Sequence, residues 1–305
     1  AGDIDIADFF KEMGGKEESS LVGKGCKVPC INAAFSNTAV SFGGFDGLHR
    51  SAIHLPCCLI PAAIAVAERQ KASGKDLILA TVIGSEITAR TAWALGADNA
   101  YNRGFHPTSL CGPFGCAVAA GKLLRLGQGA LAEALSIAAV QAAGVRPWPQ
   151  VPKAPQTAWI QVGRAAQSGV MAALLARMEV VGISDIFEHS NGFLTGHSAN
   201  PDLTRLTAGL GTAYEIKNTT LKRFGAGIYI IPGIEALLDI MQKHKIRAED
   251  IARVTFKIPT PVVPLVGSPG YPSLRGSSKS SRYLLAVTAY KGEEGMLFNR
   301  DYQSE

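Results

Sequence analysis

Charged side chains are scarce in this sequence: they make up 18% of its 305 residues, whereas hydrophobic residues make up 47%. This balance excludes a disordered or fibrous chain and indicates a globular protein with a large buried core. The basic residues are scattered, without a run of Lys and Arg interleaved with aromatic residues, and the net charge is only +5. We therefore expect no nucleic-acid partner. No apolar run reaches the roughly 20 residues that a membrane span needs, so we expect no membrane partner.

Cysteines with metal-binding spacing are also lacking. The sequence has six cysteines but no CxxC pair and no HExxH motif, and Cys57 and Cys58 are adjacent, a poor geometry for a disulfide or a metal cage. The absence of a three-cysteine cluster spacing argues against iron–sulfur chemistry. Without a visible signal peptide, this usage predicts reduced, mostly buried thiols and a cytoplasmic location.

The most informative stretch is GFHPTSLCGPFGCAVAAGKLLRL, which runs from Gly104 to Leu126. Pro107 biases His106 away from helical backbone angles, so this histidine is expected on a turn at the mouth of a helix. The many glycines and alanines that follow let this helix pack very closely against its neighbours. A histidine on a rigid loop suits a general acid or base, although a capping or core-edge histidine has the same pattern.

Helical spacing of apolar residues covers most of the chain. Asp76 is a candidate N-cap for one long helix, and Glu86 and Arg90 lie one turn apart within it, where they can pair. Pro61 fits the first turn of another helix. Residues 251–258 alternate like a β-strand, and the proline-rich residues 145–162 cannot be helical. Helices are predicted at residues 31–43, 59–71, 77–95, 129–144, 164–178, 232–244 and 283–290.

This pattern predicts a mainly α protein with an α+β subdomain. Residues 1–181 form the expected helical domain. The short turns from residue 182 onward mark the entry into a smaller α+β lid domain, residues 182–278, and residues 279–305 return to the helical domain.

Four segments of the chain resemble the MmgE/PrpD family in the family's own order. The stretch quoted above resembles GxHPTSxxGxFGAAxAAxxLL, and VGRAAQSGVMAALLA is similar to xGRAAxxGxxAAxLA. AAFSNTAVSFGGFDGLHRSAIHLPCCLIPAAIAVAE resembles an asparagine-rich helix, an acidic loop, a histidine and a PAALAxAE helix, and LKRFGAGIYIIPGIEALL resembles KxYPxxxxxHPxIDAxL. The resemblance implies a helical domain with an α+β lid, a homodimer, no metal or cofactor, and a small di- or tricarboxylate substrate.

The resemblance also assigns roles to residues. His54 and His106 match the two active-site histidines, Lys222 the lysine of the KxYP segment, and Tyr283, more loosely, a tyrosine on the returning helix. Taken alone, His54 reads as a helix cap, Lys222 as a surface lysine and Tyr283 as a core-edge aromatic. The expected substrate-binding residues are Asp46, His49, Thr108, Ser109 and Arg223.

Several positions depart from the family pattern. The acidic loop keeps only its middle aspartate, Asp46, which suits a turn equally well. A lysine is replaced by Ala158 and a histidine by Gln161, so the expected pocket loses a cation and polar groups. The terminal helical stretches also look shortened, which leads us to expect a dimer or a partner that covers the exposed helix faces.

Three functions fit these residues. The first is a cofactor-independent lyase, either a dehydratase or a decarboxylase, acting on a substrate such as 2-methylcitrate or cis-aconitate. Histidine suits the proton transfer beside a carboxylate because its unperturbed pKa of about 6.5 lies near neutral pH. The second is an isomerase or epimerase of a dicarboxylate, which needs the same acid/base pair. The third is a degenerate, non-catalytic paralogue, which the lost polar groups favour.

Overall fold

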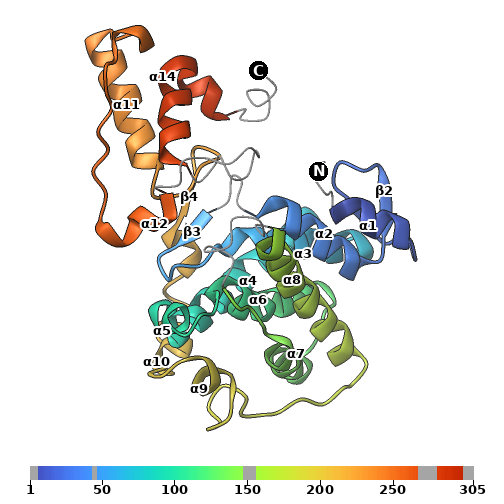
Figure 1. Cartoon of the computed structure of the whole chain (residues 1–305). Coiled ribbons are helices and arrows are strands. Elements are labelled where there is room, and N and C mark those ends of the chain that lie inside the picture. Colours follow the sequence, from blue (N-terminus) through green and yellow to red (C-terminus); the bar gives the residue numbers. More distant parts are fainter. Residues whose placement is uncertain (1–5, 43–46, 147–155, 267–279, 298–305) are drawn as a thin grey trace. The chain divides into compact units, whose positions relative to one another are not determined.

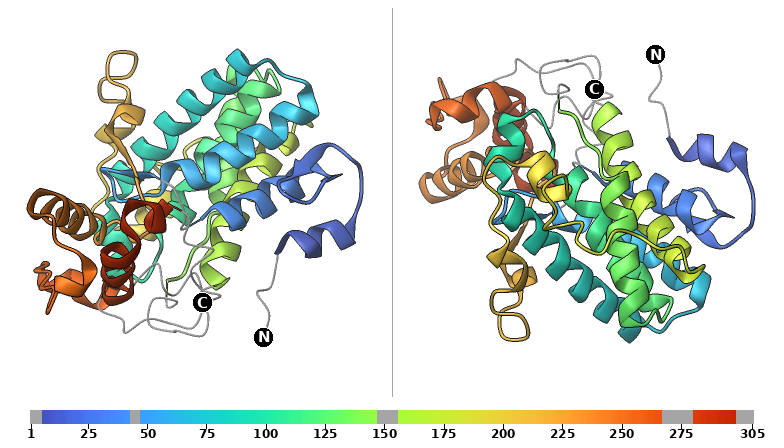
Figure 2. Two further views of the ribbon diagram at one scale, coloured as in Figure 1. Left: turned by 90° about the horizontal axis from the view of Figure 1, so that it is seen from above. Right: turned by 90° about the horizontal axis from the view of Figure 1, so that it is seen from below.

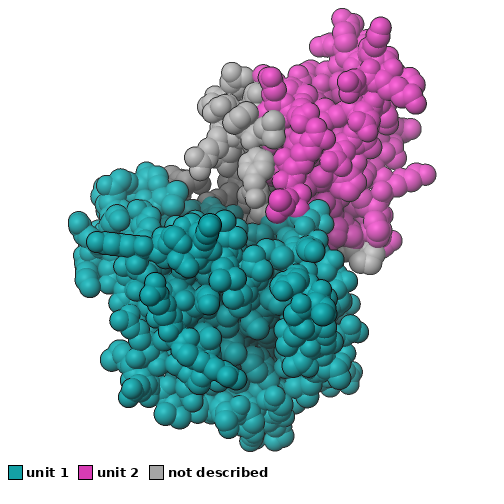
Figure 3. Space-filling view, turned by 180° about the vertical axis from the view of Figure 1, so that it is seen from behind, with its two compact units in different colours: residues 1–42, 47–148, 156–220 teal, residues 43–46, 149–155, 221–305 magenta. Residues whose placement is uncertain are grey.

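The computed structural model describes residues 6–42, 47–146, 156–266 and 280–297. The chain forms two compact units (Figure 3). Unit 1 contains residues 1–42, 47–148 and 156–220, and unit 2 contains residues 43–46, 149–155 and 221–305. The described residues of each unit have their own hydrophobic core.

Unit 1 is a set of packed helices with short strands at its edges (Figure 1). Its long helices are α2 (Cys30–Ser41), α3 (Leu55–Gln70), α4 (Gly74–Leu95), α6 (Pro107–Leu123), α7 (Gln128–Gln141) and α8 (Gln156–Arg177). Its shorter helices are α1 (Ile6–Met13), α5 (Ala97–Asn102), α9 (Phe193–His197), α10 (Thr204–Thr207) and the 3-10 helix η2 (Glu215–Asn218).

Helix α6 lies at the centre of unit 1. It packs against α3, α4, α7 and α8, and the two views of Figure 2 show these helices side by side. Every residue of α6 except Lys122 is buried. The helices approach this closely because glycines face each other: a Cβ on Gly84 of α4 would lie 2.7 Å from the carbonyl oxygen of Gly115. The small residues expected to permit close packing therefore do so.

Helix α3 begins four residues earlier than the sequence predicts. Pro56 occupies its first turn, and Pro61 lies inside the helix rather than at its start. An internal proline lacks an N–H, so the carbonyl four residues earlier loses its helical partner. That carbonyl belongs to Cys57, and it accepts a hydrogen bond from the Ser41 hydroxyl at 3.1 Å. The same hydroxyl lies 3.0 Å from the Thr38 carbonyl, so the single Ser41 proton is shared and compensates in part for the missing backbone donor.

Two further helix starts correct the sequence prediction. Ser73, not Asp76, is the N-cap of α4, and Asp76 completes a capping box by accepting from the Ser73 backbone N–H. Helix α8 begins at Gln156, within the segment predicted to be non-helical up to residue 162. The predicted pairing of Glu86 with Arg90 is confirmed, with Arg90 Nε 2.7 Å from Glu86 Oε1.

The β-structure is small. Strands β1 (Ser19–Leu21) and β2 (Cys26–Val28) form an antiparallel pair with Ser19 opposite Val28, and β3 (Gly47–His49) pairs with β4 (Thr219–Leu221). A mainly α fold with a minor β component is therefore confirmed.

The strand predicted at residues 251–258 is wrong. This segment has no regular ladder, and no neighbouring strand in the described part of unit 2 offers it a partner. Phe256 instead packs across Gly233, where an added Cβ would lie 2.9 Å from its ring. Phe256 and Ile258 are partly buried against the core of unit 2 without a sheet, whereas Val254 is exposed.

Unit 2 is built around two helices that contact each other, α11 (Ile231–His244) and α14 (Ser281–Leu297). The predicted helix at residues 232–244 matches α11, and α14 includes the helix predicted at residues 283–290. Gly292 interrupts α14 with a positive φ of 63°. The smaller elements of unit 2 are η3 (Ala248–Asp250), η4 (Thr260–Val262) and α12 (Val263–Val266).

The first unit continues to Thr220, beyond the boundary at residue 181 that the sequence suggests. Its last segment is attached to α4 through the polar network described below.

All six cysteines are free thiols, and only Cys26 is not buried. Across the described ranges, no helix is both long enough and apolar enough to cross a bilayer.

Candidate active site

Two histidines lie together at the starts of neighbouring helices of unit 1. His54 directly precedes α3 and His106 directly precedes α6. Their ring centroids are 6.4 Å apart, and Phe42 presents its ring to both, at 5.3 Å from His54 and 5.8 Å from His106. His106 is buried and His54 is partly exposed. The starts of α3 and α6 therefore bring two imidazoles close together.

Thr108 fixes the backbone of His54 to α6. Its Oγ1 accepts a hydrogen bond from the His54 N–H at 3.0 Å, and the hydroxyl oxygen is buried. The Cys57 thiol donates to the His54 carbonyl at 3.0 Å. The His54 side chain makes no capping hydrogen bond to α3. The backbone around His54 is thus held from both sides, while its ring is not used as a helix cap.

Ser109 connects His106 to helix α8. The His106 Nδ1 lies 3.0 Å from Ser109 Oγ, and Ser109 Oγ donates to Gln161 Oε1 at 3.0 Å. Gln161 Nε2 in turn donates to the Val145 carbonyl. The His106 backbone N–H donates to the Gly144 carbonyl at 2.8 Å. In the sequence, Gln161 is only a departure from the family pattern, whereas the structure places it in hydrogen-bond contact with Ser109.

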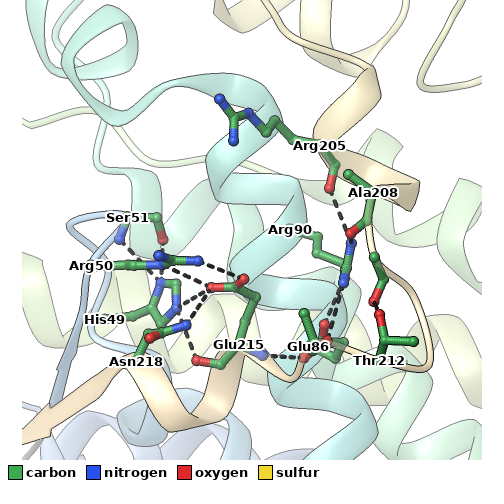
Figure 4. Close-up of polar contacts among 12 residues, drawn as sticks. His49, Arg50, Ser51, Glu86, Arg90, Arg205, Ala208, Thr212, Glu215 and Asn218 are labelled. Carbon is green, nitrogen blue, oxygen red and sulfur yellow. Dashed lines mark hydrogen bonds and ion pairs between the residues drawn. The ribbon is translucent and has the colours of Figure 1, made fainter.

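His49 belongs to a different cluster of unit 1 (Figure 4). Its Nδ1 accepts from the Ser51 backbone N–H at 3.1 Å, so the proton lies on Nε2, which is 3.2 Å from Glu215 Oε2. Burial lowers the pKa of His49, although the Glu215 carboxylate acts in the opposite direction. Both ring nitrogens have protein partners, and substrate binding by His49 stays a prediction.

Glu215 is the centre of that cluster. Its carboxylate accepts from Arg50 Nε at 3.0 Å and Nη2 at 2.8 Å, and from Asn218 Nδ2 at 3.1 Å. Burial acts to raise the pKa of Glu215, but the hydrogen bonds from Arg50 and Asn218 outweigh it, and the net pKa is lowered. The Arg50 guanidinium lies 3.9 Å above the Trp93 ring. The cluster attaches η2 to the loop after β3.

The buried pair on α4 holds the same segment from the other side. Glu86 Oε2 accepts from the Glu215 backbone N–H at 2.6 Å, and Arg90 Nη1 donates to the Ala208 carbonyl at 2.7 Å. Arg90 also approaches the carbonyls of Arg205 and Ala213, each at 3.4 Å. These contacts explain why residues 205–215 belong to unit 1.

The remaining predicted site residues lie in unit 2 or outside the described ranges. Lys222 is half-buried. Arg223 is exposed and forms an ion pair with Glu293 at 2.8 Å. The Tyr283 hydroxyl is buried and has no hydrogen-bond partner among the described residues. Asp46 lies outside the described residues. Within unit 1 the structure brings together His54, His106, Thr108 and Ser109; the roles assigned to all these residues stay predictions.

Comparisons with known proteins show which family and which curated proteins this chain is similar to. The family model described as MmgE/PrpD N-terminal domain matches residues 5–206, a range that contains both histidines. The human cis-aconitate decarboxylase is 32% identical over 66% of this chain and 42% of its own length. The cis-aconitate decarboxylase of Aspergillus terreus is 27% identical over 73% of this chain and 48% of its own length.

A cis-aconitate decarboxylase-like protein of Aspergillus oryzae is 30% identical over 77% of this chain and 52% of its own length. The chain thus spans about half the length of the curated relatives that it matches.

Proposed function

This chain belongs to the MmgE/PrpD family, and from that relationship we propose that its protein is a lyase that removes water or carbon dioxide from a small di- or tricarboxylate without a cofactor. The observation that carries the proposal is the approach of His54 and His106, with ring centroids 6.4 Å apart. Two imidazoles at this separation provide two acid/base groups to one small substrate.

Elimination of water needs both groups. One imidazole takes the proton from the carbon next to a carboxylate, and the electron pair of that C–H bond forms the new double bond. The hydroxyl group leaves with its bonding pair and takes a proton from the other, protonated imidazole. Histidine suits both tasks because its unperturbed pKa of about 6.5 permits either protonation state near neutral pH.

Decarboxylation uses the same pair differently. The bond between the carbon and its carboxylate breaks, carbon dioxide leaves, and the electron pair stays on the carbon. A protonated imidazole then delivers the proton that completes the product. The relatives named as cis-aconitate decarboxylases support this reaction and this substrate, and 2-methylcitrate is the corresponding substrate for a dehydratase.

The charge of the substrate requires cations that the two histidines alone do not supply. The position of the expected family lysine is occupied by Ala158, which is buried in α8. Lys222 is the cation proposed for carboxylate binding, with Tyr283 as a hydroxyl donor; this assignment rests on the family resemblance. Because Ala158 replaces a cation, we expect the substrate of this chain to carry fewer carboxylates than the substrate of a family member that keeps the lysine.

The test is a proton NMR time course in deuterated water with cis-aconitate, 2-methylcitrate and a racemising dicarboxylate offered separately. We expect loss of carbon dioxide or water from one of them, and loss of that turnover in His106→Ala. His244→Ala, which changes an exposed histidine of α11, is the matched control and should keep full activity. Deuterium uptake without elimination would replace the lyase by an epimerase, and no reaction with the folded protein would contradict the proposal.

We also propose a homodimer in the cytoplasm. Large apolar side chains on α2 and α3 are exposed, namely Val40, Ile60 and Ile64, and this supports burial against a second copy. The six free thiols support a reducing compartment. Light scattering at micromolar concentration tests the dimer, and a monomer would contradict it.

A further inference from the structure

We infer that Gln161, acting through Ser109, sets the tautomer of His106, so that Nδ1 carries the proton and Nε2 carries the lone pair. Gln161 is a positioning residue: it touches Ser109, and Ser109 touches His106. The importance of this tautomer for turnover rests on the proposed function. The tautomer itself is a property of the folded protein and can be measured without any substrate.

The orientation of the Gln161 amide is the first step. One end of the Gln161 amide lies at the Val145 carbonyl, and a carbonyl can only accept a hydrogen bond. The nitrogen must therefore face Val145, and the amide oxygen must face Ser109. The reversed amide would place two acceptor oxygens against each other. The hydrogen-bond network thus excludes the flip that often leaves glutamine orientations open.

The single proton of Ser109 is the second step. The amide oxygen of Gln161 can only accept, so Ser109 Oγ donates to it at 3.0 Å. A hydroxyl has one proton, and once that proton points at Gln161 the oxygen can only accept from its other neighbour. That neighbour is His106 Nδ1, at 3.0 Å. His106 Nδ1 must therefore carry a proton.

The consequence concerns the other ring nitrogen. In a neutral imidazole with a proton on Nδ1, the lone pair is on Nε2, and this nitrogen is the one that can take a proton from a substrate. Glutamine does not titrate, so its acceptor faces Ser109 at every pH. The family resemblance leads one to expect a histidine at position 161, and a histidine could exchange donor and acceptor nitrogens. In this chain the hydrogen bonds instead run in one fixed direction, from His106 to Ser109 and from Ser109 to Gln161, and we call these three residues the relay.

Tight packing holds the relay in place. A Cβ on Gly144 would lie 2.7 Å from the Ser109 Cβ and 3.6 Å from the Gln161 side-chain carbonyl carbon. The Gly144 carbonyl accepts from the His106 N–H at 2.8 Å, so the same segment fixes the histidine backbone. Ser109 is fully buried. Water therefore does not compete for the Ser109 hydroxyl, and the direction of its hydrogen bond follows from its protein partners.

The test is long-range proton–nitrogen NMR on protein labelled with ¹⁵N-histidine, in which the two ring nitrogens have different shifts in each tautomer. The resonances of His106 are identified by their loss in His106→Gln. We expect a proton on Nδ1 in the wild type. In Gln161→Met, which keeps the side-chain length but removes the acceptor, the Ser109 hydroxyl turns to donate to Nδ1 and His106 shifts to the Nε2–H tautomer.

The matched control is Gln167→Met, which makes the same change in the same helix at a residue that accepts from Arg164. It should leave the His106 resonances unchanged. A wild-type His106 with its proton on Nε2 overturns the inference, and so does a Gln161→Met protein that keeps the proton on Nδ1.

Gln161→Glu provides a second measurement if Gln161→Met does not fold. Its carboxylate still accepts from Ser109, so the Nδ1–H tautomer should persist, and its negative charge should raise the pKa of His106. An unchanged or lowered pKa contradicts the relay.

Where turnover is observed, Gln161→Met should lower kcat by up to about 10²-fold with KM nearly unchanged, because the imidazole is present but its lone pair faces away from substrate. Absence of turnover in the wild type, with the tautomer responding as expected, would refute the proposed function and leave this inference intact.

Discussion

The hydroxyl oxygen of Thr108, in the first turn of α6, accepts the backbone N–H of His54 at 3.0 Å. This contact joins the two histidine-bearing loops directly. Thr108→Val keeps the side-chain shape but leaves the His54 N–H without its acceptor, so we expect a loss of about 1–3 kcal/mol in the free energy of unfolding. Urea denaturation measures it. Thr108→Ser retains the oxygen and should lose less, and equal stability of all three proteins would show that the contact contributes nothing.

Replacement of His54 should affect turnover more than folding. His54→Ala removes one of the two proposed acid/base groups, and we expect kcat to fall by about 10²–10⁴-fold. The fold should persist because the ring makes no capping hydrogen bond to α3 and because the substitution leaves the backbone contacts of His54 in place. Steady-state kinetics and circular dichroism check the two parts. Full activity in a folded His54→Ala protein would remove His54 from the site.

The crossing of α4 and α6 should tolerate no added side chain. In Gly115→Ala the new methyl group would overlap the Thr88 hydroxyl and the Gly84 carbonyl, so the helices must separate. We expect a fall in the free energy of unfolding of about 1–3 kcal/mol or more. Gly129→Ala meets no atom within 4 Å and should be neutral or slightly stabilising. Thermal unfolding of both variants makes the comparison, and similar melting temperatures would contradict the packing argument.

The stability of unit 1 should fall as the pH decreases through about 6.5. Burial lowers the pKa of His49 in the folded protein below the unfolded value of 6.5, so between these two values the unfolded chain binds more protons. The contribution of neutral His49 to the free energy of unfolding is therefore fully present above pH 6.5, and it is lost as the pH falls through the pKa that His49 has in the folded protein. The positive charge of Arg50 also lowers the pKa of His49, and the Glu215 carboxylate raises it, but the net pKa is lowered.

His49→Gln tests this pH dependence. An amide nitrogen can replace Nε2–H as a donor to Glu215, but it does not titrate. The difference in unfolding free energy between wild type and variant, measured by urea denaturation from pH 7.5 to 5.5, should change across this range. A difference that is constant with pH would show that His49 does not contribute.

Removal of the Arg90 guanidinium should loosen the attachment of residues 205–215 to α4. Arg90→Met leaves the Glu86 carboxylate buried without its ion pair, for which we expect a loss of about 3–5 kcal/mol. Hydrogen exchange should rise most in residues 205–215. Arg205→Met breaks an exposed pair with Asp202 and should cost no more than about 1 kcal/mol. An equal effect of the two substitutions would contradict the distinction.

Local features of the chain were predictable from the sequence. Pro107 predicted that His106 leaves helical angles, and His106 has φ −104° and ψ 105°. The spacing of Glu86 and Arg90 predicted their ion pair. The place of Pro61 inside α3 was not predictable, because a proline inside a helix is unfavourable unless another group donates to the freed carbonyl. Ser41, which donates to it, lies 16 residues away from Cys57.

Features that depend on distant partners were not predictable from the residues alone. The alternation at residues 251–258 suits a strand, but a strand also requires a neighbour, which the pattern cannot show. Glu215 lies 166 residues from His49, and no local spacing connects them. The family resemblance pointed to both His54 and His106. It could not show that Gln161, noted only as an exception, would connect to one of them.

The near-complete burial of α6 has a consequence for the lifetime of the site. Local openings of a protein begin in segments with few buried contacts, and the amides of a central helix exchange with water only in the rarest and largest openings. Because His106 directly precedes this helix, its backbone position should survive the frequent fluctuations of loops and chain ends. We expect the amides of α6 to be among the slowest to exchange in unit 1, so that the histidine loses its place only when the unit as a whole unfolds.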